Sequence, residues 1–87
     1  MISGRQIRAA RGFLAWDRRD LAKKAVVTLF TIERLETGAE LSGAGMNKAL
    51  TAIKGTLEAE GIEFTDGEGV LGVLLHLKKG KARAKGK

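Results

Sequence analysis

The segment from Arg18 to Leu35 constrains the fold of this chain more than any other part of its sequence. It begins as a short amphipathic pattern in which Ala22 is small and faces inward. A tight turn follows, and Thr28 then has the type of side chain that caps a helix N-terminus. Ile32 and Leu35 recur at helical spacing after that cap. Two short helices that cross steeply need this pattern, because a small residue in the first lets the second pass over it.

Capping residues and apolar spacing predict four helices, at about residues 4–15, 18–25, 29–37 and 44–60. Ser3 and Gln6 form a capping-box pattern that begins the first helix, and Asp17 caps the second. Gly38 is expected to end the third. The fourth has apolar residues at helical spacing, namely Met46, Ala49, Leu50, Ile53 and Leu57.

After Gly61 the spacing of the apolar residues changes from a helical period to an alternating one. The sequence of residues 66–69, Asp-Gly-Glu-Gly, is typical of a tight turn. An apolar run follows this turn, so a β-hairpin is predicted over residues 62–77. The last ten residues, 78–87, contain only lysine, arginine, alanine and glycine, and we expect them to be disordered. Residues 1–77 are therefore predicted to form one domain.

The basic tail over residues 78–87 accounts for the whole formal net charge of +6. Residues 1–77 contain ten basic and ten acidic side chains, which cancel. Within this part the positive charges gather over residues 5–24 and the negative charges over residues 33–68. The pattern allows attraction to a polyanion, but it does not indicate a uniformly basic nucleic-acid clamp.

The chain resembles the Cro/C1-type (XRE-like) helix-turn-helix transcriptional regulators over about residues 3–75. The matching residues are Arg8-Ala9-Ala10-Arg11, Leu14-Ala15-Trp16, Asp20-Leu21-Ala22, Val27-Thr28, Thr31-Ile32-Glu33-Arg34, Glu36-Thr37-Gly38 and Ile62-Glu63-Phe64. The resemblance implies a mainly α fold of four to five helices with a C-terminal hairpin. It also implies a transcriptional regulator whose recognition helix, residues 28–38, enters the major groove of double-stranded DNA.

The same resemblance assigns residues to DNA contacts. Its base-reading positions correspond to Thr28, Leu29, Phe30, Glu33 and Arg34, and Thr31 lies among them. Its phosphate-binding positions correspond to Arg18 and Arg19, and Lys78 and Lys79 begin a tail that can follow phosphates. Other basic residues expected near this edge are Arg5, Arg8, Arg11, Lys23 and Lys24.

Leu29 and Phe30 depart from the family pattern, because neither can make the paired hydrogen bonds that distinguish bases. Two adjacent large apolar side chains at a helix tip are more typical of a protein-binding surface. An alternative function is therefore an antiactivator that binds a transcriptional activator protein through Leu29, Phe30 and Glu33, with Glu36 on the same helix. A third interpretation is that Phe30 packs against Trp16 and belongs to the core.

Two further departures concern the turn and the phosphate contact. The family favours glycine where this chain has Val26, and a β-branched residue adopts a positive φ poorly. The turn is therefore expected to differ from the family geometry. Arg18 replaces a glutamine that usually bridges phosphate and base, and arginine can still bind a phosphate.

The remaining residues indicate no enzyme, no cofactor and no metal site. The chain lacks cysteine, and His76 has no metal-ligand partners at suitable spacing, so a plain surface position is expected. Glu58, Glu60 and Glu63 are interpreted as a solvated face.

No leader and no membrane-length apolar run is evident, which favours a cytoplasmic protein. A homodimer through the hairpin edge or residues 44–60 and an antitoxin-like role of the hairpin also remain open.

Overall fold

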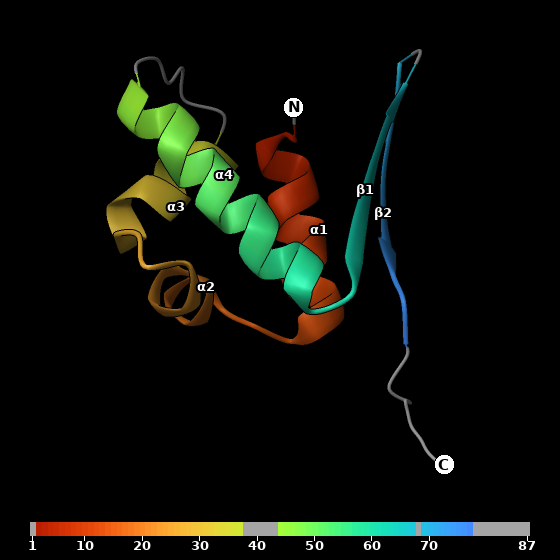
Figure 1. Ribbon diagram of the computed structural model, residues 1–87, viewed down its shortest axis with the longest axis horizontal. Coiled ribbons are helices and arrows are strands. Elements are labelled where there is room, and N and C mark those ends of the chain that lie inside the picture. Colours follow the sequence, from red (N-terminus) through yellow and green to blue (C-terminus); the bar gives the residue numbers. More distant parts are fainter. Residues whose placement is uncertain (1, 38–43, 68, 78–87) are drawn as a thin grey trace.

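A computed structural model describes residues 2–37, 44–67 and 69–77 as four helices followed by a hairpin (Figure 1). The elements are α1 (Gly4–Leu14), α2 (Arg18–Ala25), α3 (Leu29–Glu36), α4 (Ala44–Ala59), β1 (Ile62–Gly67) and β2 (Val70–Leu75). The hairpin lies beside α1 and α4, whereas α2 and α3 lie on the other side of the molecule. The prediction of a mainly helical chain with a C-terminal antiparallel hairpin is confirmed.

The ends of the helices lie close to the predicted positions. Three of them, α1, α3 and α4, end one residue before the predicted end, and α2 has the predicted bounds. The predicted stop at Gly38 and the basic tail over residues 78–87 lie outside the described residues.

Side-chain caps fix where the first three helices begin. Ser3 Oγ accepts a hydrogen bond from the Gln6 backbone N–H at 3.2 Å, and Gln6 Oε1 accepts one from the Ser3 N–H at 2.9 Å. Asp17 and Asp20 exchange the same pair of bonds at the start of α2. Thr28 Oγ1 accepts a hydrogen bond from the Thr31 N–H at 3.1 Å. Each cap satisfies backbone groups that the first helical turn leaves without partners.

The core forms where the apolar faces of the helices meet one face of the hairpin. Its buried apolar side chains are Ile2, Ile7, Ala10, Leu21, Ala22, Ala25, Ile32, Leu35, Ile53, Leu57 and Ile62. Ala22 of α2 is buried on the side of α2 that faces its neighbours α3 and α4, as the sequence pattern requires. The predicted inner faces of α2 and α3 are therefore confirmed.

The hairpin is attached to α1 by a buried glutamine. Antiparallel pairing sets Thr65 opposite Gly72. The Gln6 Nε2 group donates to both of their carbonyl oxygens, at 2.9 Å for Thr65 and 3.0 Å for Gly72. The Gln6 side chain therefore caps α1 and also positions both strands. Both polar atoms of its buried amide have hydrogen-bond partners, as buried polar groups usually do.

Beyond β2, His76 is exposed, as the sequence predicts for a surface residue. Its Nε2 atom lies 2.6 Å from Glu63 Oε1 on β1. Glu58 pairs instead with Lys54 one helical turn earlier, at 3.1 Å. Both pairs are exposed, so each contributes little to stability.

Helices α1 and α2 each end at a residue whose backbone lies in the left-handed region. Ala15, after α1, has φ of 58°, and Val26, after α2, has φ of 58°. Val26 therefore adopts the positive φ that a β-branched side chain tolerates poorly. The N–H of Val26 donates to the carbonyls of Ala22 and Lys23, which closes the end of α2. These bonds hold the residue in a conformation that costs a β-branched side chain about 1–2 kcal/mol.

Replacing Val26 with glycine is expected to raise the free energy of unfolding by about 0.5–1 kcal/mol. The valine side chain is 88% exposed, so its removal loses few contacts. Urea unfolding followed by circular dichroism measures the effect. Val27→Gly is the matched control, because Val27 packs against the core, and this change should lower stability. A lower urea midpoint for the Val26 variant would contradict the prediction.

Candidate functional site

A buried carboxylate at the end of α3 connects the first three helices. The Glu36 side chain is 0% exposed. Its Oε2 accepts a hydrogen bond from Arg11 Nε at 2.7 Å, and its Oε1 accepts bonds from Arg11 Nη2 at 2.7 Å and Arg18 Nε at 3.0 Å. Arg11 Nη1 also donates to the Trp16 carbonyl at 3.0 Å. This cluster fixes the ends of α1 and α3 relative to the start of α2.

The contacts within this cluster bear on the functions expected from the sequence for three of its residues. Arg11 was expected near a phosphate edge, but its side chain is only 15% exposed and is bound to Glu36. Glu36 was grouped with Glu33 of the same helix in the protein-binding hypothesis, but its burial keeps it out of that contact surface. Arg18 keeps partial exposure while its Nε group is used internally. No sequence signal marks these contacts, since the partners lie 18 and 25 residues from Glu36 along the chain.

The charges of this cluster stabilise one another. Burial alone would raise the pKa of Glu36, but hydrogen bonds and charge from Arg11 and Arg18 outweigh it, so the pKa is lowered. The hydrogen bond to Glu36 is the main reason that the pKa of Arg11 is raised. The carboxylate and the Arg11 guanidinium are therefore both charged at neutral pH.

The outward side of α3 presents an aromatic ring. Phe30 is 62% exposed, so the interpretation that it belongs to the core is wrong. The guanidinium carbon of Arg34 lies 5.4 Å from the centroid of the Phe30 ring, within cation–π distance. Leu29, its neighbour, is half-buried. An exposed ring and a stacked cation therefore form the centre of this face.

The other predicted contact residues fall into two groups. Arg18 and Arg19 of α2 line a hollow of about 410 Å³ together with Leu29 and Glu33 of α3. Thr28 and Thr31 instead bind each other, because the Thr28 hydroxyl donates to Thr31 Oγ1 at 2.9 Å. The remaining candidates, Lys78 and Lys79, lie outside the described residues.

Further cations lie on the exposed side of α2. Arg19, Lys23 and Lys24 are exposed, and Lys24 Nζ lies 5.3 Å from the centroid of the Trp16 ring. Arg5 and Arg8 are exposed on α1. Of these cations only Arg19 lines the hollow between α2 and α3, whereas Arg5 and Arg8 line a different hollow beside Leu71.

The comparison of the sequence with protein-family models and with curated proteins finds no match. Over residues 2–37, 44–67 and 69–77, no helix combines the length and apolarity that a membrane crossing requires. The same part of the chain contains no group of three histidine, aspartate or glutamate side chains placed to hold a metal ion.

Proposed function

We propose that this chain is a helix-turn-helix protein of transcriptional control that acts by binding another transcriptional regulator. Support for the motif comes from two short helices, α2 and α3, joined only by residues 26–28. Ala22 is buried where they meet, and Ile32 and Leu35 lock α3 onto the core. The fold expected from the family resemblance uses this arrangement to present one face of α3.

The exposure of Phe30 is the observation that favours a protein as the partner. Covering a large apolar side chain stabilises a complex by about 1.5–3 kcal/mol, and aromatic residues with neighbouring arginines are frequent centres of protein interfaces. The Arg34 guanidinium stacks on the Phe30 ring, so this face has both an exposed aromatic residue and a neighbouring arginine. Two of the polar base-reading positions, Thr28 and Thr31, bind each other, and the Nε group of Arg18 at the phosphate position binds Glu36. We therefore favour an antiactivator role over direct reading of an operator.

DNA binding is the second candidate. The observation that favours it is the group of exposed cations on α2, namely Arg19, Lys23 and Lys24. Phosphate contacts of this kind give affinity without sequence preference. In this role the Arg34 side chain would move off the Phe30 ring to contact a base edge, with Glu33 next to Arg34 on the helix. Lys78 and Lys79 would contact phosphates.

A photo-crosslinking amino acid at position 30 is expected to capture one transcriptional regulator in the native cells. The benzophenone analogue of phenylalanine suits this position because Phe30 already projects into solvent. Mass spectrometry identifies the product. The same analogue at Thr51, which is exposed on α4, is the matched control and should not give that product.

A Phe30→Asp variant gives the second readout. It should lose binding to the captured regulator by at least about tenfold, since Phe30 is the central contact, with an unchanged circular dichroism spectrum. Cross-links from position 30 to DNA in place of protein would contradict the proposal and favour the second candidate. Unfolding of the aspartate variant would contradict the exposure on which the proposal depends.

A further inference from the structure

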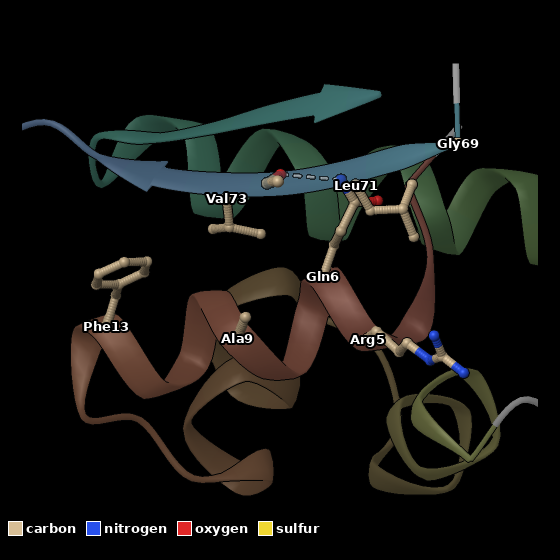
Figure 2. Close-up of a pocket in the computed structure, with 8 residues that line it drawn as sticks. Arg5, Gln6, Ala9, Phe13, Gly69, Leu71 and Val73 are labelled. Carbon is tan, nitrogen blue, oxygen red and sulfur yellow. Dashed lines mark hydrogen bonds between the residues drawn. The ribbon is translucent and has the colours of Figure 1, made fainter. Parts of the chain in front are cut away.

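A groove lies between β2 and α1 (Figure 2). Its volume is about 420 Å³. Ala9 and Phe13 of α1 line one wall, and Leu71 and Val73 of β2 line the other. Figure 2 shows Val73 pointing toward α1, with Phe13 at one end of the groove and Arg5 at the other. The side chains of its two walls are therefore mostly apolar, with the Gln6 amide between them and a cation at one end.

Exposed apolar side chains occur in the groove, at Phe13 and Leu71, and on the opposite face and beyond the end of β2. Among the described residues, those with large exposed apolar side chains on α1 and after the hairpin turn are Phe13, Val70, Leu71, Leu74 and Leu77. Phe13 is 53% exposed. Strand β2 carries no charged residue, whereas β1 carries Glu63 and Asp66. An exposed, uncharged edge strand of this kind is open to pairing with another strand.

The backbone of β2 has hydrogen-bonding groups directed toward the groove edge. The His76 N–H donates to the Gly61 carbonyl at 2.8 Å, so this pair is a hydrogen-bonded one. Bonded and non-bonded pairs alternate in an antiparallel ladder. The N–H and C=O groups of Leu71, Val73 and Leu75 therefore point away from β1. Within the described residues, these three have no backbone hydrogen bond outside the hairpin.

The position of α1 favours a single extended strand as the occupant. Helix α1 lies beneath β2 and forms the wall opposite its free edge (Figure 2). A second copy of this chain pairing through the same edge would bring its own α1 to the same face of the sheet. An extended segment without an attached helix meets no such obstacle, and its alternate side chains would lie over Ala9 and Phe13.

The charge at the groove end defines the occupant further. Arg5 lies at the Leu71 end, and Arg5 and Arg8 line an adjoining hollow of about 690 Å³ that also includes Leu71. A strand antiparallel to β2 would finish at this end, because β2 begins there. We propose that the groove binds an extended apolar segment of a partner protein as a third, antiparallel strand, with carboxylates after the apolar residues facing Arg5. The residues that line the groove do not include Phe30 or Arg34 of α3, so the chain can connect two partners.

A designed peptide tests this proposal on the full chain. Its sequence is six alternating threonine and valine residues followed by two aspartates, with blocked ends. In NMR titrations of the ¹⁵N-labelled chain, saturable shifts are expected at the amides of Leu71, Val73 and Leu75, with slower amide exchange at these residues. A second peptide with two lysines in place of the aspartates should bind about tenfold more weakly.

Two pairs of variants separate the groove from the rest of the surface. Phe13→Ser should lower the affinity for the aspartate peptide about tenfold, whereas Phe30→Ser, the matched change on α3, should leave it unchanged. Arg5→Glu should reverse the preference between the two peptides, whereas Arg19→Glu should not. The spectrum of each free variant establishes that it is folded.

Several results would overturn the proposal. These are the absence of saturable binding at millimolar peptide, equal affinity for both peptides, or shifts that map to α3. Sedimentation of the free chain at twice its 9.3 kDa mass, abolished by Phe13→Ser, would assign the groove to a second copy instead. Because Phe30→Ser should affect only the regulator proposed above, failure of one proposal does not imply failure of the other.

Discussion

Replacing Glu36 with alanine is expected to lower the free energy of unfolding by about 3–5 kcal/mol. The carboxylate is fully buried and accepts three hydrogen bonds, two from Arg11 and one from Arg18. Alanine would leave the largely buried Arg11 guanidinium without its partner, and an unpaired buried charge is strongly destabilising. A domain of this size has a total stability of only about 5–15 kcal/mol. Urea unfolding at pH 7 measures the loss.

Glu36→Gln separates charge from shape and gives a pH signature. The pKa of Glu36 is lowered in the folded chain by the two arginines, so the folded state binds this proton less readily than the unfolded state. Its stabilising contribution is therefore complete above the unfolded pKa of about 4.3 and is lost as the pH falls through the folded pKa. The stability difference between the wild type and Glu36→Gln should shrink from pH 7 to pH 3. A constant difference would contradict this account.

Replacing Gly4 with alanine is expected to destabilise the chain by about 2–3 kcal/mol. A Cβ atom at this position would overlap the Leu35 carbonyl oxygen and lie 2.9 Å from the Cα atom of Glu36. Both neighbours are backbone atoms of α3, so relief requires that α1 and α3 move apart. That movement would also lengthen the hydrogen bonds from Arg11 to Glu36.

Gly12 provides the matched control within the same helix. A Cβ atom at Gly12 would meet nothing within 4 Å, so Gly12→Ala should raise stability by about 0.5–1 kcal/mol through helix propensity alone. Thermal unfolding of the two variants should therefore give shifts of opposite sign. If both alanines stabilised the chain, the close approach of α1 to α3 would be wrong.

The burial of the α3 side chains shows where prediction from the sequence stops. Ile32 and Leu35 follow helical spacing and lie in the core, as predicted. Glu36 follows them at the next position and is also buried, although a glutamate at a helix end is usually solvated. Only the arginines of two other helices make its burial favourable. Phe30 is the opposite case, since it is apolar but exposed.

The helix starts, the hairpin and the apolar faces were determined by the sequence itself, because each depends on residues within about one helical turn or one strand pair. Ser3, Asp17 and Thr28 bind backbone groups three residues away, so the sequence pattern of each cap is local. The cluster around Glu36, the exposed ring of Phe30 and the groove beside β2 depend instead on residues from different elements. Their geometry exists only after the helices and the hairpin have packed together, so the tertiary structure alone decided them.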